Sequence, residues 1–132
     1  MSNIVITSIA LMGVLVFVLG ANVTRQRALR GKAGGTQMPT DPADALLIAV
    51  RAHGNAAEYI PTLCVLLVVG STLTDGWWLD LLAVAAVVVR SVHAIGMLTS
   101  ATLASYGPFR AVGATGTYMV GIALGVTVLG AL

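Results

Sequence analysis

Four long runs of apolar residues alternate with short polar segments along this chain of 132 residues. The runs cover residues 4–24, 45–74, 77–98 and 109–131. Each is long enough for an α-helix to cross a bilayer, which takes roughly 20 residues. The pattern predicts an all-α integral membrane protein, a bundle of four transmembrane helices that forms a single domain over residues 1–132.

Composition narrows the class of protein further. Hydrophobic residues make up 58% of the chain and charged residues only 9%, with a mean hydropathy of +0.95. A soluble domain carries about 25% charged residues. So few charges exclude a soluble globule, a disordered tail and a nucleic-acid binder. Cys64 is the only cysteine, so we expect no disulfide within the chain and no metal site built from several cysteines. We expect a packing role for this thiol.

The first apolar run has a second interpretation as a signal peptide. However, residues 1–3 carry no basic side chain, and the run is longer than the apolar region of a usual signal peptide. We therefore expect a retained transmembrane helix.

The charges between the runs predict the orientation. The second and third runs are separated by Asp75 without Lys or Arg. Arg110, at the start of the fourth run, is the only charge near the third connection. The positive-inside rule places the first and third connections in the cytoplasm, so we expect both termini to be external. The first connection carries most of the basic residues, namely Arg25, Arg27, Arg30 and Lys32.

The rest of the first connection, from Arg30 to Pro42, is rich in Gly, Pro and Thr. This composition predicts irregular chain. At its end, Asp41 or Asp44 is a suitable N-cap for the second helix.

The second run carries polar side chains inside a membrane span. Arg51, Asn55 and Glu58 follow the spacing i, i+4, i+7 and share one helical face, with Tyr59 at its edge. The helical rise places Glu58 about 24 Å from Thr74. An ionisable residue within a span normally faces the bundle interior or a wet cavity.

Polar residues of the other helices fall at a similar depth. Arg90 lies about 18 Å inward from Trp78, and His93 is one turn farther along the same helix. Because neighbouring helices run in opposite directions, these residues reach the depth of Glu58. Arg110 lies at the start of the fourth run, near the cytoplasmic boundary of the membrane. The spacing predicts one polar layer towards the cytoplasmic side.

Two interpretations of this layer remain open. Glu58 and Arg90 could neutralise each other and fix the packing of their helices. The excess of arginine, with Arg51 and Arg110 beside that pair, instead favours an anion, either a small molecule or a lipid headgroup. His93 is either a proton carrier or a hydrogen-bonded packing residue.

The fourth run has a small-residue face, which lets helices approach closely and favours assembly with other chains. Its glycines are Gly113, Gly116, Gly121 and Gly125.

Three segments resemble the MAPEG superfamily, the membrane-associated proteins in eicosanoid and glutathione metabolism. RAHGNAAEYIP, from Arg51 to Pro61, resembles the pattern Arg-x-x-x-Asn-x-x-Glu-x-x-Pro that opens the family's second helix. RSVHAIGM (residues 90–97) and FRAVGATGTY (residues 109–118) resemble segments of the third and fourth helices in small bacterial members. The resemblance covers the whole chain in length, number of spans and spacing of loops.

The resemblance implies a homotrimer of four-helix subunits in the bacterial inner membrane, in contact with membrane lipids. It also implies that glutathione binds between neighbouring subunits near the cytoplasmic boundary. Arg110 is then the residue beside the thiol, where a guanidinium favours the thiolate. Arg51 would hold a carboxylate of glutathione, Glu58 its amino group, and Asn55 and Tyr59 its peptide groups.

The resemblance adds Arg90 and His93 of the third helix as glutathione contacts. It adds Arg27, or Arg25, from the neighbouring subunit. Eicosanoid-forming members often have tyrosine where this chain has His93 and Met97, so the binding mode differs at these positions.

The function that the resemblance implies is a glutathione-dependent transferase or peroxidase acting on lipophilic electrophiles. Glutathione would be its co-substrate, and no metal is required. A non-catalytic protein that binds lipid or glutathione is the main alternative. A small proton-coupled exporter with Glu58 as carrier is a weaker one, since small four-span exporters usually place their acidic residue in the first span.

Overall fold

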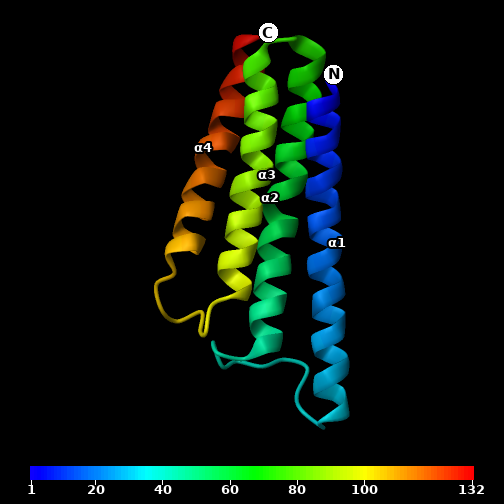
Figure 1. Ribbon diagram of the computed structural model, residues 1–132, viewed down its shortest axis with the longest axis vertical. Helices are drawn as coiled ribbons and strands as arrows, with labels where there is room; N and C mark the ends of the chain where they lie inside the picture. The colour runs from blue at the N-terminus through cyan, green and yellow to red at the C-terminus, as the bar shows by residue number, and fades with distance from the viewer.

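The computed structural model describes residues 1–132 as four long α-helices joined by short connections (Figure 1). All four helices are long and apolar enough to cross a membrane. The predicted all-α architecture of four membrane-spanning helices is therefore confirmed. The helices are α1 (Asn3–Lys32), α2 (Ala45–Leu73), α3 (Trp77–Leu98) and α4 (Pro108–Gly130).

The helices α2 and α3 lie between α1 and α4 (Figure 1). Each outer helix packs against both central ones, and α1 and α4 do not touch. Both termini and the α2–α3 connection lie at one end of the bundle, which we call the terminal end. The connections 33–44 and 99–107 lie at the other end, which we call the loop end.

The first helix is longer than the predicted span, because it continues past Thr24 to Lys32. The expectation of irregular chain from Arg30 onward is therefore wrong for the first three residues of that segment. Arg, Gln, Ala and Leu are good helix formers, and they carry the helix out of the apolar run. Gly34, with φ of 70°, follows the end of the helix. With 30 residues, α1 is about 45 Å long and exceeds the roughly 30 Å hydrocarbon core.

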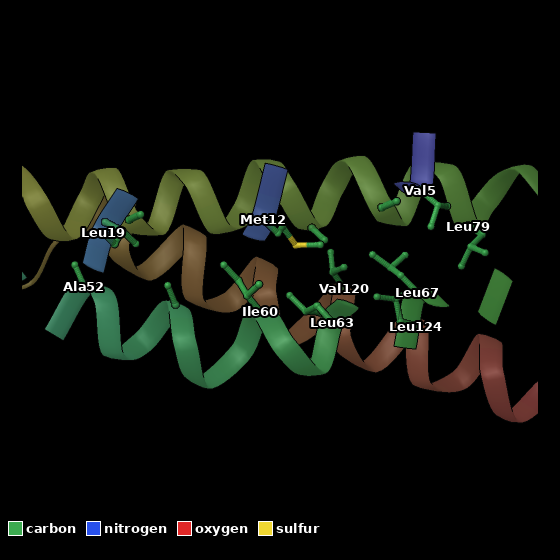
Figure 2. Packing of buried hydrophobic residues seen from close by; sticks show 14 of the residues in the cluster. Val5, Met12, Leu19, Ala52, Ile60, Leu63, Leu67, Leu79, Val120 and Leu124 are labelled. Carbon is green, nitrogen blue, oxygen red and sulfur yellow. The ribbon is translucent and has the colours of Figure 1, made fainter. Parts of the chain in front are cut away.

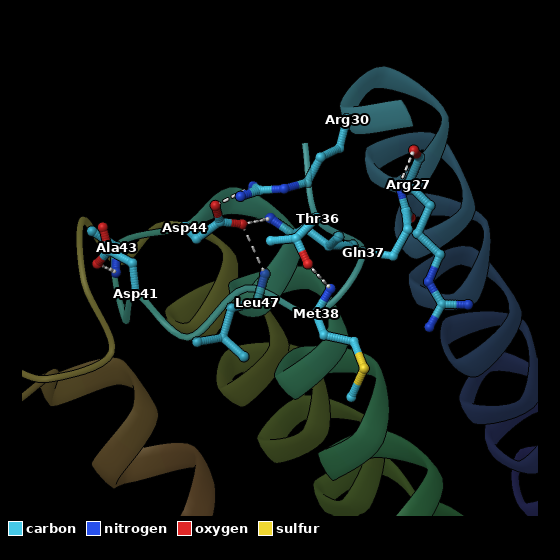
Figure 3. A network of polar contacts seen from close by, with 10 residues as sticks. Arg27, Arg30, Thr36, Gln37, Met38, Asp41, Ala43, Asp44 and Leu47 are labelled. Atoms are coloured by element: carbon cyan, nitrogen blue, oxygen red, sulfur yellow. Dashed lines mark hydrogen bonds and ion pairs between the residues drawn. The ribbon is translucent and has the colours of Figure 1, made fainter. Parts of the chain in front are cut away.

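Polar contacts at the loop end join α1 to α2 (Figure 3). Asp44 is the N-cap of α2 and accepts hydrogen bonds from the amides of Leu46 and Leu47, at 2.8 and 3.3 Å. Of the two predicted caps, Asp44 is thus the correct one, and Asp41 instead accepts from the amide two residues later. Arg30 forms an ion pair with Asp44. The ion pair ties the last turn of α1 to the first turn of α2.

Apolar side chains from all four helices form the main core of the bundle (Figure 2). A second, smaller cluster of Val23, Leu46 and Ala49 joins α1 to α2 at the loop end. Trp77 and Trp78 lie exposed in the first turn of α3 at the terminal end, where interfacial aromatic residues are expected. The labelled core residues of Figure 2 include Val5, Met12, Leu19, Ile60, Leu67 and Leu124.

The helices α3 and α4 approach each other closely, and glycines allow it. A Cβ atom at Gly113 would lie 2.5 Å from the backbone nitrogen of His93, and one at Gly96 would lie 2.7 Å from a backbone nitrogen of α4. Gly116 also packs tightly against α3, whereas Gly125 has nothing within 4 Å. In the predicted small-residue face, Gly113 and Gly116 therefore serve packing inside the subunit, whereas Gly125 makes no such contact.

Candidate functional site

Arg90 of α3 joins three helices in the loop-end half of the bundle. Its side chain is only 1% exposed. The Nη2 atom donates a hydrogen bond to Oδ1 of Asn55 on α2 at 2.8 Å, and Nη1 donates to Oγ1 of Thr117 on α4 at 3.3 Å. Thr117 in turn donates to the carbonyl of Gly113 at 2.7 Å. These bonds fix the relative rotation of α2, α3 and α4.

The ion pair between Glu58 and Arg90, one of the two interpretations of the polar layer, does not form. The chain has a single ion pair, between Arg30 and Asp44, and Glu58 is exposed on the surface of α2. Glu58 follows Asn55 by three residues and is therefore rotated by about 60° around the helix. As a result, the amide of Asn55 points to α3, and the carboxylate of Glu58 points out of the subunit.

Two tyrosines continue the polar cluster towards the surface. The Arg90 guanidinium carbon lies 5.5 Å from the centroid of the Tyr59 ring, which is a cation–π arrangement. The hydroxyls of Tyr59 and Tyr118 are 3.4 Å apart, and the ring centroids are 5.7 Å apart. We call Asn55, Arg90, Tyr59, Thr117 and Tyr118 the arginine cluster.

His93 and Arg110 form a second tie between α3 and α4. Nδ1 of the buried His93 lies 3.0 Å from the backbone carbonyl oxygen of Arg110. The guanidinium of Arg110 donates to the carbonyls of Leu103 and Ser105 in the α3–α4 connection. Both side chains thus make contacts inside the subunit, and those of His93 fit the packing alternative.

Arg51, Glu58 and Arg27 have no ion-pair partner in the chain. Arg51 and Glu58 are exposed on α2, seven residues and about 10 Å apart along the helix axis. Arg27 is exposed on the loop-end extension of α1. Because α1 and α4 do not touch, the subunit does not bring Arg27 to the first turn of α4. The predicted polar layer is therefore only partly assembled within one chain.

A groove of 330 Å³ lies between α2 and α4. Tyr59, Thr117 and Tyr118 line its loop-end edge, and the groove continues from them towards the terminal end. We call it the α2–α4 groove. Its remaining lining residues are Thr62, Leu63, Leu66, Gly121 and Ile122.

Thr117 and Tyr118 were absent from the sequence-based prediction of the site. Neither side chain carries a charge at neutral pH, and the prediction depended mainly on charged residues at membrane depth. Thr117 follows Arg110 by seven residues, a spacing that places both on one face of α4. That signal was present in the sequence. The pairing of Tyr118 with Tyr59 depends on how α2 and α4 are rotated, and no spacing along the chain shows it.

Comparison with protein families decides the classification. Residues 5–130 match the model of the MAPEG family. The chain belongs to the MAPEG family. The resemblance in the three segments is thereby confirmed. No curated protein and no solved structure matches the chain. MAPEG membership implies a family of glutathione-related membrane enzymes, and it agrees with the four membrane-spanning helices.

Proposed function

We propose that this MAPEG protein is a membrane-embedded glutathione-dependent transferase or peroxidase that acts on lipophilic electrophiles. The observation that carries the proposal is the exposed pair of opposite charges on α2. Arg51 and Glu58 lie about 10 Å apart along the helix, and neither has a partner in the chain. Glutathione is zwitterionic, with carboxylates and an ammonium group. Arg51 would hold a carboxylate, and Glu58 would pair with the ammonium.

The exposure of Glu58 also supports an assembly. A carboxylate at membrane depth is normally enclosed by protein or faces water, yet Glu58 faces outward from the isolated subunit. We propose a homotrimer in which a neighbouring subunit covers this face and brings Arg27 to the ligand. Light scattering in detergent, with the detergent mass subtracted, should give three chains. A stable monomer that binds glutathione would contradict the shared site.

The loop end would face the cytoplasm of a bacterial inner membrane. It carries the basic residues outside the spans, whereas the terminal end carries Asp75 and Asp80 without Lys or Arg. This distribution follows the positive-inside rule. Cysteine-accessibility labelling should reach a Ser2→Cys variant, but not Thr36→Cys, from outside the cell. Labelling of Thr36→Cys from outside would reverse the orientation.

The arginine cluster would both contact glutathione and hold the contacting residues in place. Arg90 uses the carbonyl oxygen of Asn55, so the amide nitrogen of Asn55 remains available to donate to a peptide carbonyl of glutathione. Tyr59 lies on the same side of α2 and would contact the second peptide group. Arg90 and His93 are themselves buried. We therefore assign them to holding the walls of the site.

Arg110 would stabilise the thiolate. A free thiol has a pKa of about 8.5, so only a few per cent is thiolate at neutral pH. Each unit by which a nearby guanidinium lowers that pKa corresponds to about 1.4 kcal/mol. Arg110 has five N–H donors, and carbonyls of the α3–α4 connection use two of its nitrogens. The remaining donors could face the sulfur.

Thermal unfolding in detergent tests the binding step. Glutathione at about 100 times its Kd should stabilise the protein by about 2.7 kcal/mol. Arg51→Ala should abolish the shift, and Lys32→Ala, which removes an exposed cation elsewhere, should retain it. A conjugation assay with several electrophiles then tests catalysis. Stabilisation without conjugation would support the non-catalytic alternative, and no stabilisation at all would overturn the proposal.

A further inference from the structure

A second groove, of 320 Å³, lies between α1 and α3 in the terminal-end half of the bundle. We call it the α1–α3 groove. No residue of α2 or α4 lines it, so it is separate from the exposed charges of α2 on which the proposed glutathione site depends. Its lining residues include Asn3, Thr7, Ser8 and Leu11 on α1 and Val84 and Val88 on α3.

Ser8 carries a hydroxyl without a partner at this groove. The residue is only 4% exposed, yet its Oγ atom makes no hydrogen bond within the chain. The other two buried hydroxyls behave differently, because Ser71 donates to the carbonyl of Val68 at 2.8 Å and Thr117 donates to that of Gly113 at 2.7 Å. A buried polar group normally has a hydrogen-bond partner. Since Ser8 lines the groove, its hydroxyl can reach an acceptor that lies there.

The hydroxyl of Ser8 lies just below the membrane boundary. Ser2 donates a hydrogen bond to the carboxylate of Asp80, which holds the start of α1 level with the first turn of α3. That turn also carries Trp77 and Trp78, which are typical of the headgroup level. Ser8 follows Ser2 by six residues and is about 9 Å deeper. The headgroup region of one leaflet is about 5–7 Å thick, so Ser8 lies at the top of the hydrocarbon core, where lipid ester groups begin.

The polarity of the groove changes with depth in the same order as that of a phospholipid. The amide side chain of Asn3 lies nearest the headgroups, and the hydroxyls of Thr7 and Ser8 follow one turn deeper. The α3 wall is apolar, and its residues Val84 and Val88 are 47% and 53% exposed, so the groove opens towards the bilayer. Water is absent from the bilayer core. The acceptor that the membrane supplies at this depth is therefore the carbonyl oxygen of a lipid ester.

We propose that the α1–α3 groove is a binding site for a diacyl phospholipid, in which Ser8 donates a hydrogen bond to an ester carbonyl. One acyl chain lies along Val84 and Val88, and the headgroup lies beside Asn3. The bound lipid satisfies the buried hydroxyl and fills the space between the two helices. The site takes no part in the proposed glutathione reaction and does not depend on it.

The test compares two lipids that differ only at the ester group. One is phosphatidylglycerol with ester-linked chains, and the other is its analogue with the same chains linked as ethers, which has no carbonyl. Native mass spectrometry of the protein in an alkyl maltoside gives the Kd of each lipid. The wild type should bind the ester lipid about fivefold more tightly, the ratio that one neutral hydrogen bond gives.

Ser8→Ala should lose this preference, because its affinity for the ester lipid should fall to that for the ether lipid. Alanine is a good helix former, so α1 should remain intact. Ser91→Ala is the matched control, since Ser91 is half-buried on α3 outside the groove, and it should keep the fivefold preference. Equal affinities in the wild type, or a preference retained in Ser8→Ala, would overturn the hydrogen bond to the ester.

A second variant tests the groove itself. A long side chain at position 88 leans towards the N-terminus of α3 and so lies over the groove beside Val84. Val88→Phe should therefore weaken the binding of both lipids, whereas Val126→Phe, an equally conservative change at an exposed site on α4, should weaken neither. Unchanged affinities in Val88→Phe would overturn the groove as the site. A changed number of chains in Val88→Phe, with lipid binding unaltered, would make the groove a contact between copies of this chain instead.

Discussion

The two halves of the bundle are built from the same four helices but are held together differently. In the terminal-end half, the buried side chains are apolar apart from two serines, and Leu67 and Leu124 are fully enclosed. In the loop-end half, the buried set includes Arg90, His93 and Thr117. Apolar burial gives little driving force between helices in lipid, so the first half depends on close packing. The second half adds directed hydrogen bonds, which fix the rotation of each helix.

This difference between the two halves indicates which of them can support a ligand site. Packing of apolar side chains holds α2 and α4 together but leaves their exact rotation loosely specified. The bonds of Arg90 to Asn55 and Thr117 specify it. The exposed charges of α2 and the tyrosine pair lie beside those bonds. The site proposed for glutathione would need such support, because a binding site must hold its contacts within about 0.5 Å.

The largest expected effects come from truncating one large buried side chain in each half. Arg90→Ala and Leu67→Ala should each cost about 2–5 kcal/mol of stability, because each leaves a cavity. Only Arg90→Ala should also remove the glutathione-induced rise in Tm, because Asn55 and Tyr59 lose their support. Thermal unfolding in detergent with and without glutathione measures both effects. If Leu67→Ala lost the glutathione-induced rise in Tm to the same extent, the assignment of ligand support to the loop-end half alone would be wrong.

A charge change on the exposed face of α2 should affect ligand binding and leave the fold intact. Glu58→Gln removes the proposed partner of the ammonium group, and hydrogen bonds to charged groups contribute about 1.5–3 kcal/mol. Glutathione affinity should fall accordingly, while the Tm without ligand stays near the wild-type value. Asp75→Asn, at the terminal end, is the control and should bind normally. Unchanged affinity in Glu58→Gln would remove Glu58 from the site.

Two glycines of α4, one in each half of the bundle, allow a matched pair of alanine substitutions. Gly113→Ala places a Cβ atom 2.5 Å from the backbone nitrogen of His93, so α3 and α4 must move apart. Overpacking of this kind costs about 1–3 kcal/mol. Gly125→Ala meets open space, and alanine is the better helix former. Its Tm should stay the same or rise slightly, and a large loss there would instead place Gly125 in a contact between subunits.

The smallest expected effect is at the loop end and depends on pH. Partial burial raises the pKa of Asp44, but hydrogen bonds from Arg30 and from the amides of Leu46 and Leu47 outweigh it, so its pKa lies below the usual 3.8. The stabilisation is therefore fully present above the usual pKa and is lost as pH falls through the lowered value. Asp44→Asn keeps a capping side chain and should flatten the acid dependence of Tm.

Asp41→Asn is the control for this change, since Asp41 has no ion-pair partner. It should leave the acid dependence of Tm as in the wild type. An unchanged acid dependence in Asp44→Asn would mean that the ion pair contributes nothing to stability.

The sequence by itself determined the class of protein and the approximate depth of several polar residues. Long apolar runs with few charges have one stable arrangement in a membrane, because every backbone polar group must be bonded within a helix. The motif from Arg51 to Pro61 pointed to the family, and the spacing of Arg51, Asn55 and Glu58 placed them on one face of α2. These conclusions depend on local periodicity, which a single sequence contains.

Only the tertiary structure decided which polar groups meet. Of the two interpretations that the sequence left open for Arg90, the ion pair with Glu58 does not form and Arg90 donates to Asn55 instead. Tyr118 joins the cluster as an unforeseen member. Both results depend on the rotation of α2 and α4 about their axes. That rotation is set by glycines that let α3 and α4 approach and by bonds between helices far apart in the chain. A helix face can be derived from periodicity, but its partner depends on packing among all four helices.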